Sequence, residues 1–146
     1  MRPERTIRER IDASIRRFET DVDCFVATTT PDGRPNVAPL SVLWHGGVFV
    51  ICTRRSTHTV KNIQHQPVAR LVYGPTRDVV IVDVRVEIRE LADVDDAALT
   101  AFHRHVGWNI AEETNRYVAL VCTPGIIQAW REEPERNIME NGRWLE

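Results

Sequence analysis

Residues 79–89 read VVIVDVRVEIR. From Val80 onward every second residue is aliphatic, and the charged Asp83, Arg85 and Glu87 fall between them. Side chains along a strand point alternately to opposite faces of a sheet. This period of two therefore predicts a β-strand with one face in a hydrophobic core and the other face in water.

Six further segments on either side of this stretch are rich in the β-branched and aromatic residues that strands favour. Turn signals separate several of them, the clearest being PDGRP over residues 31–35 and HGG over residues 45–47. Short, evenly spaced strands favour a small closed or nearly closed antiparallel barrel, and we expect them to follow one another in meander order. Besides 79–89, the predicted strands are Cys24–Thr29, Asn36–Trp44, Val48–Thr53, Val68–Tyr73, Tyr117–Thr123 and Ile126–Trp130.

Amphipathic segments predict three helices, at about residues 4–18, 60–65 and 94–106. The helices do not alternate with the strands, and the chain has no Gly-x-Gly-x-x-Gly motif, so a parallel dinucleotide-binding fold is disfavoured. A length of 146 residues suits a single domain over residues 1–146. The predicted fold class is mainly β with flanking helices, built on a six- to seven-stranded antiparallel barrel.

Charge and hydropathy exclude several classes of partner. The formal net charge is −2, with 19 basic and 21 acidic residues, so we expect no nucleic-acid binding through phosphate neutralisation. No apolar run is long enough to span a membrane, and the charged start of the chain, Met1–Arg5, predicts no secretory signal.

The thiol and imidazole groups predict neither metal binding nor covalent catalysis. Cys24, Cys52 and Cys122 are odd in number and lie in apolar, strand-like stretches, which indicates buried thiols in a reduced, cytoplasmic protein. His103 and His105 are two residues apart on a predicted helix and point to different sides, so they are not expected to share a metal ion.

Polar chemistry is concentrated in the segment TRRSTHTVKN, residues 53–62, which joins a predicted strand to the short second helix. The start of a helix presents free N–H groups and partial positive charge, which suit an anion. Thr59 is expected either to cap this helix or to donate to a phosphate. Lys61, the only lysine in the chain, would add a mobile positive charge. Arg54 or Arg55 would add a planar guanidinium group that can form two parallel hydrogen bonds. The alternative interpretation is a solvated loop followed by an ordinary helix cap.

Taken together and in order, these segments resemble the pyridoxamine 5′-phosphate oxidase-like superfamily of split β-barrels, which bind flavin or deazaflavin. The resemblance covers nearly the whole chain, although each motif alone is weak. It rests on the strand Cys24–Thr29 with its 31–35 turn, the strand Val37–Val42, the segment 53–62 ending at Pro67, Asp78-Val79-Val80, and Gly107-Trp108 before Tyr117.

The resemblance implies an FMN-binding split-barrel fold and a homodimer with FMN or deazaflavin coenzyme F-420 at the subunit interface. Thr59 and Lys61 match the family's phosphate-binding hydroxyl and lysine. The sequence departs from the family at Val60, where classical oxidases carry an arginine, and the C-terminal substrate motif is not recognisable, so vitamin B6 synthesis is not predicted. The implied cofactor-binding residues are Thr53, Arg54, Arg55, Thr59, Lys61 and Asn62 near the phosphate or ring, and Pro39, Leu40, Ser41 and Val42 along the ring and ribityl chain, largely through their backbone.

The predicted activity is that of an oxidoreductase that moves a hydride between the cofactor and an unidentified small organic substrate. Protein side chains are poor hydride carriers, so the redox chemistry would belong to the cofactor, and no catalytic side chain is predicted. One alternative is a non-catalytic protein that binds or sequesters a flavin, F-420 or a tetrapyrrole. A further alternative is a small barrel that binds no cofactor and acts as an interaction domain.

Overall fold

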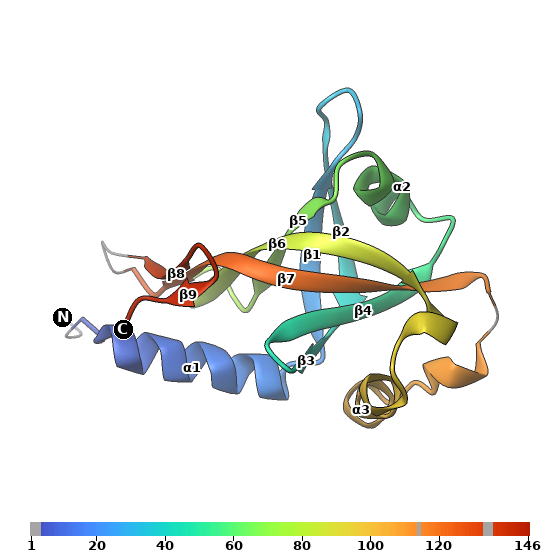
Figure 1. Ribbon diagram of the computed structural model, residues 1–146. Helices are drawn as coiled ribbons and strands as arrows, with labels where there is room; N and C mark the ends of the chain where they lie inside the picture. Colours follow the sequence, from blue (N-terminus) through green and yellow to red (C-terminus); the bar gives the residue numbers. More distant parts are fainter. Residues whose placement is uncertain (1–3, 114, 133–135) are drawn as a thin grey trace.

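The computed structural model describes residues 4–113, 115–132 and 136–146, and these form a nine-stranded antiparallel sheet flanked by helices (Figure 1). The strands are β1 (Asp23–Thr29), β2 (Pro35–Ser41), β3 (Leu43–His45), β4 (Val48–Arg54), β5 (Val68–Tyr73), β6 (Val79–Glu90), β7 (Tyr117–Trp130), β8 (Asn137–Glu140) and β9 (Arg143–Trp144). The helices are α1 (Ile7–Thr20), α2 (His58–His65) and α3 (Asp96–Val106), with short 3-10 turns η1 (Leu91–Asp93) and η2 (Ile110–Glu112).

The strand order is β2-β1-β5-β6-β7-β4-β3, with β8 added to β7 and β9 to β8. The expected meander order is therefore wrong, because β1 pairs with β5 and β4 pairs with β7. The two ends of this order, β2 and β3, are separated in the chain by Val42 alone, so the chain itself closes the sheet into a barrel. Val42 is fully buried, and its N–H donates to the carbonyl of Val22 at 2.8 Å.

Two predicted strand boundaries also change. The segment Asn36–Trp44 is interrupted at Val42 and becomes β2 and β3. Conversely, Pro124 and Gly125 do not end a strand, because β7 runs through them with a shift of register: Asp83 faces Ile126 and the next residue, Val84, faces Pro124. Gly125 is the additional residue of this bulge, which accommodates a proline that lacks an N–H. The C-terminal strands β8 and β9 were not predicted, since their sequence is short and polar.

The barrel interior is closed at one end by α1, which covers the core beneath β3 (Figure 1). Thr6 and Glu9 form a capping box that starts this helix. Phe18 is fully buried, with its ring centroid 4.9 Å from that of Phe49 and 5.1 Å from that of Tyr73. This aromatic contact fixes α1 against the barrel.

A second hydrophobic cluster lies between α3 and the outer face of β4. Phe49 and Ile51 of β4 face the barrel interior, whereas Val50 and Cys52 face α3 and its Phe102. Both faces of β4 are therefore buried, unlike those of a strand at the surface of a sandwich. This double packing holds the end of β4, and the polar segment that follows it, in a defined position.

Candidate functional site

The exit of β4 leads through a tight turn into α2, and Thr57 organises this turn. The Thr57 hydroxyl accepts a hydrogen bond from the N–H of Val60 at 3.3 Å and donates one to the carbonyl of Arg54 at 3.1 Å. Thr57 is the N-cap, so the expectation that Thr59 caps the helix is wrong. The helix begins at His58, two residues earlier than predicted.

The start of β7 lies beside this turn, because Arg54 faces Tyr117 in the antiparallel register. The Arg54 Nε donates to the Tyr117 hydroxyl at 3.3 Å, and its guanidinium carbon is 5.7 Å from the centre of the Tyr117 ring. The N–H of Arg55 continues the ladder by donating to the carbonyl of Arg116 at 2.7 Å. Strand pairing thus brings two distant arginine-containing segments together.

The side chain of Arg55 binds Glu90, at the end of β6, through two parallel hydrogen bonds of 2.8 and 2.6 Å. Its Nε also donates to the carbonyl of Asn115 at 3.1 Å. The hydrogen bonds between the two side chains raise the pKa of Arg55 and lower the pKa of Glu90. The planar fork of Arg55 is therefore occupied within the chain, and it clamps the turn to β6 and to the segment before β7.

These residues surround a cavity of about 400 Å³ at this end of the barrel, lined by Arg54, Arg55, Ser56, Asn115 and Arg116. Of the three guanidinium groups around this opening, that of Arg55 is engaged by Glu90, and those of Arg54 and Arg116 suit a phosphate or carboxylate. We call it the β4-exit cavity. The site residues predicted from the sequence do not include Ser56, Asn115 or Arg116. Ser56 lies inside the quoted segment, but nothing local to Asn115 and Arg116 signals a site, because only the β4–β7 pairing brings them there.

Lys61 lies on the exposed side of α2, and the described residues that line the β4-exit cavity do not include it. Lys61 forms no salt bridge with residues 4–113, 115–132 or 136–146. The structure therefore places this residue at the surface of α2, outside the lining of the cavity.

Three other predicted residues are buried behind the turn. Thr53, Thr59 and Asn62 are 6%, 3% and 4% exposed. The Asn62 amide donates to the Thr28 hydroxyl at 3.0 Å, which fixes α2 against β1. In this chain they support the turn from inside and do not line the cavity.

The predicted ring-binding residues lie on β2 and at its end. Pro39 is exposed, Leu40 packs against the core and Val42 is fully buried. The Ser41 hydroxyl donates to the Asp23 carboxylate at 2.7 Å. The side chains of Leu40 and Val42 are thus used by the core, which leaves the backbone of this segment as the group that a ligand would meet.

Thiol and metal chemistry have no site among the described residues. Cys24, Cys52 and Cys122 are free and buried, and burial raises the pKa of Cys24 and Cys52 to about 12. A thiolate is the reactive form, so these thiols are inert near neutral pH. No three His, Cys, Asp or Glu residues of the described chain are grouped to hold a metal ion. None of its helices has the length and apolar character needed to cross a bilayer.

Comparison with known proteins identifies the family. The family model described as "Pyridoxamine 5'-phosphate oxidase" matches residues 9–139. A search of curated proteins finds no match. The chain belongs to the pyridoxamine 5′-phosphate oxidase family, which confirms the resemblance read from the sequence.

Solved structures confirm the split-barrel fold at low identity. A protein described as "F420 Reductase" is 20% identical, with a TM-score of 0.63 over 77% of this chain and 93% of that one. A pyridoxamine 5′-phosphate oxidase-related, FMN-binding protein from Nostoc punctiforme is 15% identical, with a TM-score of 0.61 over 91% and 88%. A heme-binding protein from Mycobacterium smegmatis is 19% identical, with a TM-score of 0.69 over 93% of this chain and 57% of that one. At such identities the likeness concerns the fold alone.

Proposed function

We propose that this protein binds FMN or coenzyme F-420 and transfers a hydride between that cofactor and a small organic substrate. The observation that carries the proposal is the β4-exit cavity, where three arginines surround one opening in a member of the pyridoxamine 5′-phosphate oxidase family. Two of the solved structures compared above are an F420 reductase and an FMN-binding protein. Their shared fold supports either FMN or F-420 as the cofactor of this protein.

The residues present fit a phosphate group. Arg54 and Arg116 would bind it by charge-assisted hydrogen bonds, together with the Ser56 hydroxyl and the first N–H groups of α2. Lys61 would approach from the exposed face of α2. Arg55 would position the turn through Glu90, and the buried Thr53, Thr59 and Asn62 would hold it from behind, while the backbone of Pro39, Leu40, Ser41 and Val42 would lie along the ring.

When bound, the cofactor would supply the hydride chemistry. The chain would bind and orient the ring, and no side chain is assigned as a catalytic acid or base. This division of roles agrees with the site, where the charged groups of the β4-exit cavity are arginines that do not exchange protons near neutral pH.

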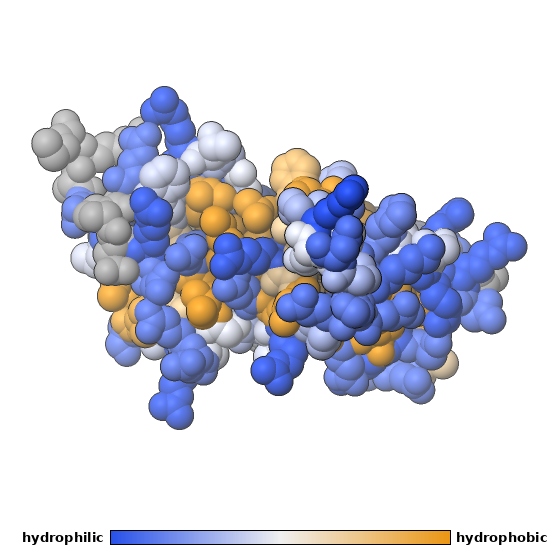
Figure 2. Space-filling view, turned by 90° about the horizontal axis from the view of Figure 1, so that it is seen from above, coloured by the Kyte–Doolittle hydropathy of each residue, from blue (hydrophilic) through white to orange (hydrophobic). Residues whose placement is uncertain are grey.

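We also propose a homodimer in a reducing, cytoplasmic setting. Four of the large hydrophobic residues that remain exposed, Phe25, Val37, Val68 and Ile126, lie on the outer face of β1, β2, β5 and β7. Figure 2 shows apolar side chains gathered over the middle of the molecule, between hydrophilic regions. A second copy covering this face would remove them from water. The buried free thiols support a reducing compartment.

The experiment is a fluorescence titration of the purified apo-protein with FMN and with F-420 in parallel. Saturable binding of one cofactor, at one per chain, is the expected result. Reduction of bound FMN by NADPH, or oxidation of reduced F-420 only when an acceptor is present, would then establish turnover. Absence of binding by both cofactors at micromolar concentration contradicts the proposal.

A second candidate is a non-catalytic protein that binds a flavin, F-420 or a tetrapyrrole. It is favoured by the fold shared with a heme-binding protein. Binding of a chromophore without any turnover in the same assay would support this candidate over the oxidoreductase.

A further inference from the structure

A second cavity, of about 340 Å³, lies between α1 and the loops at the other end of the barrel. Eight of the eleven described residues that line it are polar or charged. The charged ones are Arg5, Arg16, Arg17, Arg131, Asp21 and Asp78. We call it the arginine cavity. Its size is that of a small-molecule site, but its lining suits a polar ligand and not an aromatic ring.

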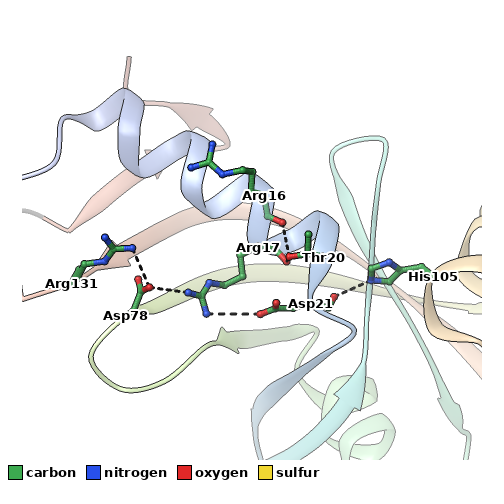
Figure 3. A network of polar contacts seen from close by, with 7 residues as sticks. All are labelled: Arg16, Arg17, Thr20, Asp21, Asp78, His105 and Arg131. Carbon is green, nitrogen blue, oxygen red and sulfur yellow. Dashed lines mark hydrogen bonds and ion pairs between the residues drawn. The ribbon is translucent and has the colours of Figure 1, made fainter.

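Asp78 organises the arginine cavity (Figure 3). One oxygen of its carboxylate accepts hydrogen bonds from Arg17 at 3.0 Å and from Arg131 at 3.1 Å. Arg17 also lies 3.8 Å from the Asp21 carboxylate. The side chains of Arg17, Asp78 and Arg131 are 20%, 31% and 35% exposed, so this network is partly withdrawn from water. Asp78 thus orients two guanidinium groups, one from α1 and one from the residue after β7, toward the same carboxylate oxygen.

The backbone at Gly74 shows that the position of Arg17 is built into the fold. Gly74 has a φ of +83°, and a β-carbon there would overlap the Arg17 guanidinium. Only glycine therefore leaves room for this side chain between α1 and the β5–β6 loop. An arginine held by packing and by a carboxylate loses little freedom when it binds a further group.

Basic side chains outnumber acidic ones in the lining of the cavity, with four guanidinium groups to two carboxylates. Arg16 contributes to this excess, and it lies on α1 outside the hydrogen bonds of Asp78. A planar guanidinium fork matches the oxygens of phosphate and carboxylate groups.

The arginine cavity is separate from the β4-exit cavity. The two are lined by residues at opposite ends of β7, Arg116 and Ala129, which are on the order of 40 Å apart along an extended strand. Likewise, Asp21 precedes β1, whereas Thr28, which binds Asn62 of α2, lies near its other end. A ligand of the arginine cavity is therefore not held by the turn after β4.

We propose that the arginine cavity is a second ligand site, which binds the oxyanion group of a small molecule, a phosphate ester or a carboxylate. Arg17 and Arg131, oriented by Asp78, would form the fixed part of the site. Arg16 would close over the ligand from the helix. The site is independent of the function proposed for the other end of the barrel.

The test uses calorimetric titration with inorganic phosphate and with succinate, at constant ionic strength in chloride. Because phosphate would also bind the turn after β4, all proteins carry Arg54→Ala and Lys61→Ala. Into this background we place Arg16→Ala, which leaves the Asp78 network intact. The matched control is Arg104→Ala, an exposed arginine on α3 outside the cavity that changes the net charge by the same amount. Unchanged thermal unfolding of each variant verifies the fold.

The expected result is saturable binding of at least one anion in the background protein, with a Kd that rises about ten-fold or more in Arg16→Ala and stays unchanged in Arg104→Ala. Backbone NMR shifts on titration should centre on Thr20, Asp78 and Arg131. Phosphate binding without succinate binding would identify the ligand as a phosphate ester, and the reverse would identify a carboxylate. Absence of saturable binding, equal losses in the two variants, or shifts centred elsewhere would overturn the proposal.

Discussion

At the scale of single residues, Lys61 is the clearest test of the proposed cofactor site, because it is exposed and holds no part of the core. We expect Lys61→Ala to weaken binding of FMN or F-420 about ten- to hundred-fold, the value of a charge-assisted phosphate contact of roughly 1.5–3 kcal/mol. Stability should not change. The measurement is fluorescence titration, with Gln64→Ala, an exposed change on the same helix, as the control. Equal affinities of Lys61→Ala and the unmodified protein would remove Lys61 from the site.

The buried thiols predict a loss of stability at alkaline pH. The pKa values of Cys24 and Cys52 are raised by burial to about 12 from an ordinary value near 9, so the folded state retains protons that the unfolded state releases. Their contribution to stability is complete below pH 9 and is lost as the pH rises toward 12. Each thiol should lower the free energy of unfolding by up to about 1.4 kcal/mol per pH unit in this range. Urea unfolding between pH 8 and 11 measures how the free energy of unfolding changes with pH. This dependence should be weaker in Cys52→Ala. An equal dependence in that variant would exclude Cys52 as a cause.

The residues of the candidate site show how far a sequence can be interpreted. The strand-to-helix segment 53–62 was recognisable from its hydroxyls and cations, and it does form a turn into a short helix. The sequence left Thr59 either as the helix cap or as a phosphate donor, and the cap is Thr57, because either hydroxyl satisfies the same local pattern. Asn115 and Arg116 were missed for a different reason: their position beside Arg54 follows from long-range pairing, which no local pattern encodes.

At the scale of elements, the loop between β5 and β6 depends on Gly74. We expect Gly74→Ala to destabilise the protein by at least about 2 kcal/mol, since an alanine at positive φ costs roughly 1–2 kcal/mol and the Arg17 guanidinium must also move. The melting temperature should fall by about 4–8 °C.

The matched control for this change is Gly125→Ala, at the bulge of β7. A β-carbon at Gly125 would meet nothing within 4 Å. Its melting temperature should therefore stay close to that of the unmodified protein. Gly125 has neither the positive φ nor the close contacts of Gly74, so equal shifts for the two variants would contradict a special requirement for glycine at position 74.

The elements themselves were predictable to different degrees. The alternation over 79–89 located β6 almost to the residue, because one face of the strand is in the barrel and the other in solvent. The run Val48–Thr53 was also located, although both of its faces are buried. Pro124 and Gly125 predicted the end of a strand, but β7 continues through them with a bulge. Strand order was not predictable, since alternation tells which face is buried and not which strand is the neighbour.

At the scale of the whole molecule, the exposed apolar face of β1, β2, β5 and β7 predicts self-association. We expect light scattering to give a dimer of about twice the 16.8 kDa chain mass at micromolar concentration. Phe25 and Val37 are 53% and 62% exposed in the single chain, so a second copy would cover them in the proposed dimer. Phe25→Asp combined with Val37→Asp should give monomers, because burying an unpaired charge at the interface costs free energy.

The control for this change is Thr100→Asp, an exposed position on α3, which lies outside this face of the sheet. It should remain dimeric. A monomeric unmodified protein, or an apolar-face variant that stays dimeric, would contradict a dimer built on this face.

The pairing of β4 with β7 also has a consequence for biosynthesis. Tyr117 follows its partner Arg54 by 63 residues, so at ordinary translation speeds the ribosome needs about 3–13 seconds to make the missing neighbour. During that delay a nascent chain carries an unsatisfied strand edge that can join another polypeptide. Polysome-bound chains that end before β7 should accordingly recruit chaperones or coaggregate, whereas chains extended past Trp130 should resist protease.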